Sequence, residues 1–197
     1  GERRVAIALG LAAISSLASL VLLSVVAIQL LSSGFSPIPS IILLTSALFL
    51  LPSLFVGIVS PILTKLAIDA DPHQHGAVIG RMYALGTLGS IAGTLSAGYL
   101  FISWIGSTGT VIAVAAIYAL LGLAFAISDS LRSLFLVFLV AAGTGLGWWG
   151  ERIQAFTSPC KIESDYFCIR IADYSDQAGR PSSLMVLDHL VHSINDR

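Results

Sequence analysis

The sequence predicts an α-helical integral membrane bundle of about five transmembrane helices followed by a small β-hairpin segment. Of its 197 residues, 56% are hydrophobic and 11% are charged, and the mean hydropathy is +0.91. Soluble domains carry roughly 25% charged residues. After residue 150 charged residues become frequent, and apolar and polar residues alternate as they do in strands. These observations divide the chain into a transmembrane helical domain, residues 1–150, and a tail, residues 151–197.

The predicted helices are apolar stretches that come close to the ~20 residues needed to cross a bilayer. They are residues 5–31, 40–63, 79–104, 108–127 and 133–149. Pro52 and Pro61 are expected to kink or shorten the second stretch, and a polar loop at 68–75 separates it from the third. No Asp, Glu, Lys, Arg or His lies in the middle of a stretch, which disfavours an ion-coupled or proton-coupled transporter.

Small residues recur at helical spacing in two of these stretches. Such spacing lets helix backbones approach each other in lipid, where the hydrophobic drive is absent. We interpret the rows as packing within one bundle, and a substrate path or a seam between two copies of the chain is the alternative. The glycines concerned are Gly86, Gly89, Gly93 and Gly98 in the third stretch and Gly143 and Gly147 in the fifth.

The basic residues predict the orientation in the membrane. Arg3 and Arg4, then Lys65 and Arg81, and then Arg132 fall on one side if every stretch crosses. By the positive-inside rule the amino terminus is cytoplasmic. We expect an inner-membrane protein. The charge pattern favours a tail outside the cytoplasm, and the side stays open, because a fifth stretch that does not cross, or further helices before residue 1, would change the count.

The net charge argues against a nucleic-acid-binding protein, and the N-terminal sequence argues against a cleaved signal peptide. A net charge of −1 without a basic cluster argues against nucleic acid as a partner. Residue 1 is Gly, and the first apolar stretch is too long for a signal peptide. We therefore expect the chain to begin inside a longer gene product.

The tail predicts a β-hairpin. "DYFCIRIA" alternates in character, and residues 166–172 and 183–187 read as two strands joined by a polar link at 173–180. A lone hairpin is marginally stable in water and so short a tail buries little core. We expect its exposed edge to pair with a further domain or with another chain.

Side chains able to bind a metal or form a disulfide occur in two places. His73 and His75 lie two apart in the acidic loop 68–75, which permits a metal site but favours a solvated loop, because further ligands are needed. Cys160 and Cys168 are too far apart for a C-x-x-C motif. A disulfide between them is plausible if the tail lies outside the cytoplasm, and the sequence leaves this open.

Two stretches, residues 60–110 and 162–193, together carry a family resemblance. "IESDYFCIRIAD" and "GRPSSLMVLDHLVHS" resemble the amino-terminal strand region of the spermidine synthase (polyamine aminopropyltransferase) family, which carries a pattern close to E-S-x-Y-Q-x-I-x-V, a Gly-Arg turn and L-D-G-x-x-Q-[ST]. "SPILTKLAID" and "GAVIGRMYALGTLGSIAGTLSAGYLFISWIGSTGT" resemble the last helices of fused proteins in which a transporter-like membrane region precedes a spermidine-synthase-like domain.

The resemblance implies a set of substrate-binding residues, Tyr166, Asp188 and His192. Phe167 stands where the family has a Gln, His189 replaces a Gly, and His192 replaces a second Gln, so amide groups that would bind a nucleoside or an amine are missing. Asp188 with the two histidines could also imitate a general base held by a carboxylate. We favour a structural or substrate-lining role for Asp188.

The resemblance also implies a cofactor, decarboxylated S-adenosylmethionine, held by a Gly-rich loop of a Rossmann-like domain beyond the hairpin. The clustered glycines at 143–147 lie in a predicted membrane helix and follow no strand, so we expect no cofactor site in this chain and no catalysis by it alone. The favoured function is a membrane portion that anchors and partly walls an aminopropyltransferase-like domain, with the bilayer and that domain as partners. The alternative is a non-enzymatic scaffold or accessory subunit of a membrane complex, and a transporter is a weaker third hypothesis.

Overall fold

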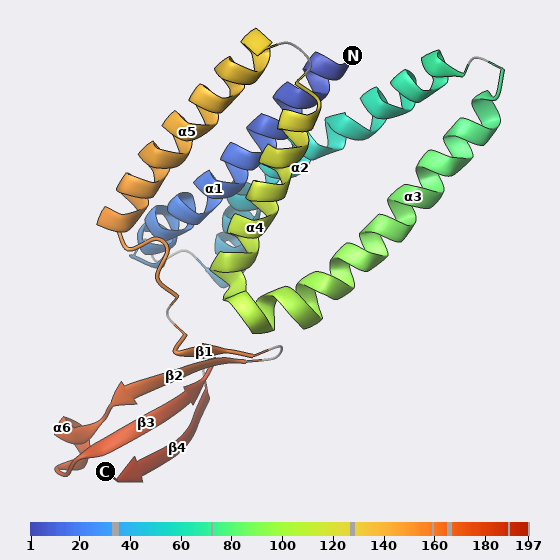
Figure 1. The fold of residues 1–197 in the computed structure, drawn as a ribbon. Coiled ribbons are helices and arrows are strands. Elements are labelled where there is room, and N and C mark those ends of the chain that lie inside the picture. The colour runs from blue at the N-terminus through green and yellow to red at the C-terminus, as the bar shows by residue number, and fades with distance from the viewer. Residues whose placement is uncertain are drawn as a thin grey trace. The chain divides into compact units, whose positions relative to one another are not determined.

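The computed structural model describes residues 1–32, 36–71, 73–126, 129–158, 160–164, 167–188 and 190–196 (Figure 1). Helices come first and a small antiparallel sheet comes last. The chain forms two compact units, one made of Gly1–Ser90 and Val111–Phe156, the other of Ile91–Thr110 and Thr157–Arg197.

The helical class predicted for residues 1–150 is confirmed. The long helices are α1 (Glu2–Ser32), α2 (Pro37–Ala70), α3 (His75–Ser96), α4 (Ile102–Ala124) and α5 (Asp129–Arg152), with a π-helical turn, η1 (Ala97–Phe101), between α3 and α4. Within the described residues, four helical stretches are long and apolar enough to cross a membrane. These features are compatible with an integral membrane protein.

One of those four stretches accounts for two of the predicted spans. His75–Ala124 has 50 residues, which is about 75 Å of helix against a hydrocarbon core of about 30 Å. Its regular geometry breaks at Gly106, where φ is 70° and ψ is 174°. Gly106 lies between the predicted spans 79–104 and 108–127, so the expected break between them is a kink at a glycine inside a continuous helical stretch.

The boundaries of α2 differ from the prediction. The helix contains both Pro52 and Pro61 and continues to Ala70, past the predicted end at residue 63. The predicted loop 68–75 therefore shortens, because its first residues complete the last turn, where the Asp71 N–H donates to the Ala67 carbonyl. Proline removes one N–H donor from a helix, and the neighbouring hydrogen bonds hold the remaining ladder together.

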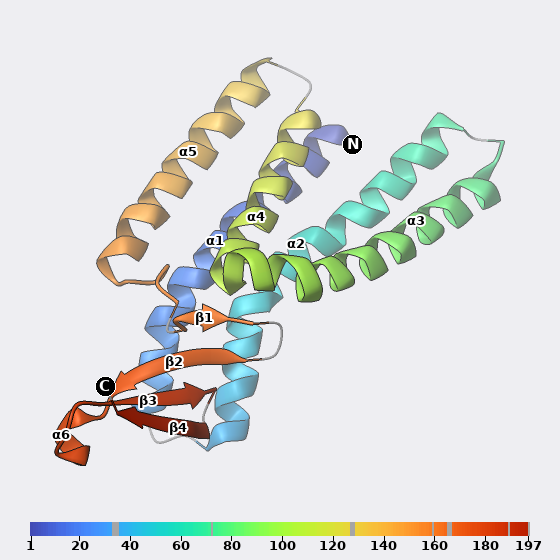
Figure 2. The same ribbon diagram turned by 60° about the horizontal axis from the view of Figure 1, so that its bottom comes forward.

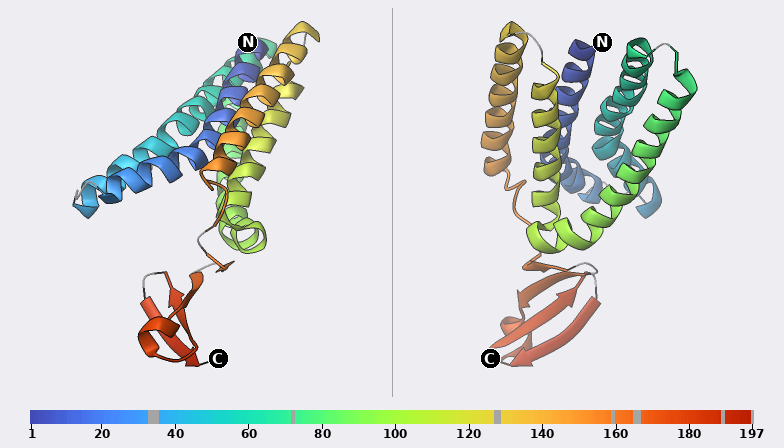
Figure 3. Two further views of the ribbon diagram at one scale, coloured as in Figure 1. Left: turned by 90° about the vertical axis from the view of Figure 1, so that its left-hand side faces the viewer. Right: turned by 45° about the vertical axis from the view of Figure 1, so that its right-hand side comes forward.

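The first unit has its core on one face of α1, which contacts both α2 and α5; the side view shows α1 and α2 running together (Figure 3). The buried positions of α1 recur every three or four residues, the spacing of one helix face. They are Val5, Ala8, Leu9, Ala12, Ala13, Ser16 and Leu20, with Ala6 and Val21 beside them. Mostly small side chains on this face allow close approach of the neighbouring helices.

Phe135 of α5 completes this core. Its side chain is 6% exposed, and its ring lies so close to the backbones of Gly10 on α1 and Gly122 on α4 that a methyl group at either glycine would overlap it. Gly10 and Gly122 make room for this ring, and the sequence singled out neither of them.

The predicted packing glycines have different surroundings. At Gly86, Gly89, Gly93, Gly98, Gly143 and Gly147 no described atom lies within 4 Å of the place that a Cβ would occupy. No residue of α3 is buried, and Leu85 and Leu88 are 66% and 64% exposed. Packing of these rows within the chain is therefore not observed, and their pairing with another chain stays a prediction.

The tail is a sheet with more strands than predicted. Its strands are β1 (Ile162–Glu163), β2 (Cys168–Asp173), β3 (Ser182–Leu187) and β4 (Leu190–Asp196), with a short helix, α6 (Ser175–Ala178), in the link between β2 and β3. The order is β1-β2-β3-β4 and every pair is antiparallel (Figure 2). The predicted hairpin is present, with Ile169 opposite Leu187 and Ala172 opposite Leu184.

The additional strand β4 was missed because its sequence, "LVHSIND", mixes polar and apolar residues without clean alternation. It forms an edge of the sheet, and Leu190, Val191 and Ile194 are all more than half exposed. The sheet therefore shows little apolar burial of its own, as the length of the tail predicted.

Candidate functional site

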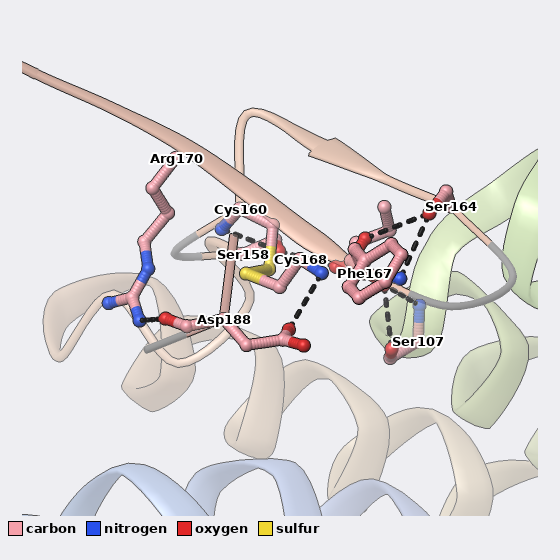
Figure 4. Close-up of a disulfide and its surroundings, with 9 residues drawn as sticks. Ser107, Ser158, Cys160, Ser164, Phe167, Cys168, Arg170 and Asp188 are labelled. Atoms are coloured by element: carbon pink, nitrogen blue, oxygen red, sulfur yellow. Dashed lines mark hydrogen bonds between the residues drawn. A yellow bond between two sulfur atoms is a disulfide. The ribbon is translucent and has the colours of Figure 1, made fainter. Parts of the chain in front are cut away.

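The polar groups of the tail gather at the end of the sheet where β2 begins and β3 ends. Figure 4 shows Cys168 and Arg170 of β2 beside Asp188, the residue that follows β3. Cys168 also carries the disulfide to Cys160. This end of the sheet contains one of the predicted substrate-binding residues, Asp188, and is the candidate site.

Asp188 is fixed by hydrogen bonds to β2. Its carboxylate Oδ1 accepts from the Cys168 N–H at 2.9 Å, and its own N–H donates to the Cys168 carbonyl at 2.9 Å. Its carbonyl accepts from Nη2 of Arg170 at 2.7 Å. Asp188 has φ of 52°, a left-handed conformation that Asp tolerates better than most residues. These hydrogen bonds hold Asp188 at the end of β3 against β2, and a role in lining a substrate site stays a prediction.

Arg170 carries a polar atom without a partner. Its Nη2 is used by Asp188, whereas its Nε is buried and makes no hydrogen bond within the described part of the chain. A buried N–H of this kind costs about 1–3 kcal/mol when it stays unpaired.

The disulfide that the sequence left open is formed. Cys160 precedes β1 and Cys168 opens β2, with 5.2 Å between their Cα atoms. The bond closes a loop around β1 and holds the loop end to the same residue whose N–H binds Asp188. Disulfides persist in oxidising compartments and are rare in the cytosol of most organisms.

A second polar cluster centres on Glu163 of β1. Its Oε2 accepts from the backbone N–H and the hydroxyl of Ser107, both at 2.6 Å, and its Oε1 accepts from the Ser158 hydroxyl. Ser107 follows the left-handed Gly106, so its N–H belongs to the first turn of the helix that resumes there. A carboxylate at that position accepts a hydrogen bond from a first-turn N–H that has no partner within the helix. It is also attracted by the positive end of the helix dipole.

These hydrogen bonds lower the pKa of Glu163. The largest cause is the Ser107 hydroxyl, followed by the Ser158 hydroxyl, while partial burial acts in the opposite direction. Each donor stabilises the carboxylate over the acid. The sequence showed Glu163 as a match to the family pattern but not this role, because its partner lies 56 residues earlier.

Of the other predicted site residues, the structure describes His192. Tyr166 lies outside the described residues, as does His189. His192 is exposed and sits in a β-bulge, since Met185 pairs with Ser193 and the next residue of β3, Val186, pairs with Val191. At this end of the sheet, Oδ1 of the Asp188 carboxylate is occupied by the backbone N–H of Cys168.

The described structure adds no support for a metal site at the loop histidines. His73 and His75 are both exposed, and no group of three or more His, Cys, Asp or Glu able to hold a metal ion occurs among the residues that the structure describes.

Comparison with known proteins returns no relative: no family model, no curated protein and no solved structure matches the chain.

Proposed function

We propose that this chain is a membrane anchor that carries a spermidine-synthase-like sheet and supplies one wall of a transferase-like domain. The residues quoted above for the family support the second part of this proposal. The observation that carries the first part is the Glu163 cluster, in which a strand of the sheet binds the helix turn at Ser107.

The Glu163 cluster is suited to anchoring because it joins elements distant in sequence. The carboxylate receives three donors, two from Ser107 and one from Ser158. Charge-assisted hydrogen bonds are shorter and roughly twice as strong as neutral ones. The first strand is therefore attached to the residues around Gly106 by more than the covalent linker at 157–161.

The disulfide supports an orientation with the tail outside the cytoplasm, in the membrane of a cell whose outer compartment is oxidising. The basic residues support the same orientation. Decarboxylated S-adenosylmethionine, the cofactor implied by the resemblance, is made in the cytoplasm. We therefore propose anchoring and wall formation, rather than aminopropyl transfer by this chain.

The orientation is tested by labelling intact cells. A membrane-impermeant maleimide should react with Cys160 and Cys168 only after a reductant that stays outside the cell has been added. A single cysteine placed at His73, in variants that lack the native pair, should react only after the cells are opened. Labelling in the reverse order would contradict the orientation.

The anchoring function is tested on protein from native membranes. An antibody against residues 183–196 should capture either a species heavier than the 20.7 kDa of this chain or a companion chain, with a transferase-like domain that binds decarboxylated S-adenosylmethionine. Capture of a 20.7 kDa species alone, without binding of that cofactor, would contradict the proposal.

A scaffold or accessory subunit is the second candidate, favoured by the uncovered rows on α3 and α5. Gly89, Gly93 and Gly147 have no described atom within 4 Å of a Cβ position, and surfaces of this kind pair helices in lipid. Cross-linking from residue 89 in native membranes discriminates the two: a helical membrane partner without a transferase domain supports the scaffold.

A further inference from the structure

A cleft lies between α2 and α3. It has a volume of about 730 Å³ and is lined on α2 by Thr64 and Lys65 and on α3 by Tyr83, Gly86 and Thr87. This volume lies within the ~300–1,000 Å³ of small-ligand sites. All of its residues belong to the first compact unit.

The cleft contains one cation and a second cation lies close by. Lys65 also lines a neighbouring cavity of about 440 Å³ together with Arg4 and Asp69, so two basic side chains face one carboxylate there. Lys65 is five residues from the end of α2 at Ala70, about 7.5 Å along the helix axis. With the orientation proposed above, Lys65 lies toward the cytoplasmic end of α2, where it can reach the lipid headgroups.

The hydroxyl groups of Thr64 and Thr87 in the cleft can act only as hydrogen-bond acceptors toward a ligand. Thr64 donates its hydroxyl hydrogen to the Ser60 carbonyl at 2.9 Å, and Thr87 donates to the Tyr83 carbonyl at 2.9 Å. Each hydroxyl keeps lone pairs and has no second hydrogen to give. The donors left for a ligand are the Lys65 ammonium and the Tyr83 phenol, both exposed in the cleft.

The walls beyond the cleft are apolar and uncovered. Leu85 and Leu88 of α3 and Ile58 of α2 are 66%, 64% and 43% exposed. In a bilayer such faces meet acyl chains, so a headgroup in the cleft would be carried there by its own lipid. Basic pockets between membrane helices on the cytoplasmic side are a known mode of anionic headgroup binding.

We propose that this cleft binds one anionic phospholipid whose headgroup carries hydroxyls, of the phosphatidylglycerol class. The phosphate accepts from Lys65 and Tyr83, and the headgroup hydroxyls donate to Thr64 and Thr87. The side of the membrane comes from the orientation proposed above, but the pairing of groups does not depend on it.

The test is lipid retention by the purified chain in detergent, read by native mass spectrometry. The chain should retain one phosphatidylglycerol after washing, in preference to phosphatidylcholine. Lys65→Gln should lower retention about fivefold, the effect of one basic side chain at an anionic surface, and Lys65→Arg should restore it. Arg81→Gln removes the same charge on α3 without touching either cavity and should leave retention unchanged.

Two further measurements test the role of the headgroup hydroxyls and guard against unfolding of the Lys65→Gln variant. Phosphatidic acid, which lacks the glycerol hydroxyls, should bind less well than phosphatidylglycerol, and Thr87→Val should remove that difference. If Lys65→Gln unfolds the chain in detergent alone, Tyr83→Phe serves in its place, because Tyr83 is 76% exposed and its hydroxyl can be removed without a cavity.

Equal retention of phosphatidylcholine, or unchanged retention in Lys65→Gln, overturns the proposal. Displacement of the lipid by free glycerol phosphate at the same concentration overturns it too, because the cleft would then be a site for a soluble anion. Because lipid retention is measured in detergent, its result can be interpreted even if the labelling experiment contradicts the proposed orientation.

Discussion

The core around Phe135 and the sheet end around Cys168 are held together in different ways. Phe135 is enclosed by apolar atoms and by the backbones of two glycines. The sheet end is held by a disulfide and by hydrogen bonds to two carboxylates, Asp188 and Glu163. Packing does not respond to reductant or to mild acid, whereas the links of the tail respond to both. The tail is therefore the part whose stability its surroundings can change.

The largest effect is expected from Phe135→Ala. Removing a buried aromatic ring costs about 3–5 kcal/mol in a core that cannot collapse around the space. Phe138→Ala on the same helix is the control, since Phe138 is 48% exposed. Denaturation in mixed micelles should show a much lower midpoint for the first variant, at every pH and with or without reductant. Equal midpoints would contradict the assignment of Phe135 to the core.

Loss of the disulfide comes next. For a loop with a sequence separation of 8 residues, the chain-entropy model gives roughly 2.5 kcal/mol. The double change Cys160→Ser and Cys168→Ser should speed hydrogen exchange in β1 and β2 and leave α1 unchanged. Faster exchange in α1 as well would mean that the stability of the helical core depends on the stability of the tail.

Glu163→Gln should have a smaller effect. The amide keeps the shape and loses the charge that its three donors face, and we expect a loss of about 1 kcal/mol at this solvent-accessible site. Glu151→Gln removes an exposed carboxylate of α5 and is the matched control. Hydrogen exchange at the Ser107 amide reports the change directly, and an unchanged rate there would argue against the cluster.

The smallest effect is the pH dependence of the same cluster. The Glu163 pKa is lowered in the folded chain from its ordinary value of 4.5, so its contribution to stability is fully present above pH 4.5 and is lost as the pH falls through the folded pKa. The protection factor of the Ser107 amide, which is its exchange rate corrected for the intrinsic pH dependence of exchange, should therefore fall below about pH 4.5 in the native chain. Glu163→Gln should abolish that dependence, and Phe135→Ala should leave it in place.

The helices could be predicted because an apolar run of this length has few other structures available to it. Their boundaries were less predictable: α2 passes two prolines, and α3 continues through η1 and Gly106 into α4. Glycine spacing did not show which glycines pack, since Gly10 and Gly122 act through a ring on α5. A small residue permits close approach, but the large partner decides where it occurs.

In the tail the central hairpin followed from alternation, while β4 and the Glu163 cluster did not. A bulge at His192 breaks the period of two on which a strand prediction rests. Ser107 and Glu163 are separated by 56 residues, and nothing in either local sequence indicates the other. Asp188 follows β3 with a φ of 52° and is held by hydrogen bonds to β2, whereas its predicted part in binding a substrate stays a prediction.

The bulge in β4 also bears on how this chain behaves at high concentration. β4 is an edge strand with several exposed apolar residues, and a long flat edge of that kind is a template on which further chains add as strands. The unpaired His192 interrupts the regular row of N–H and C=O groups and increases the local twist. Bulges in exposed edge strands are one of the features by which proteins limit edge-to-edge growth of sheets into fibres.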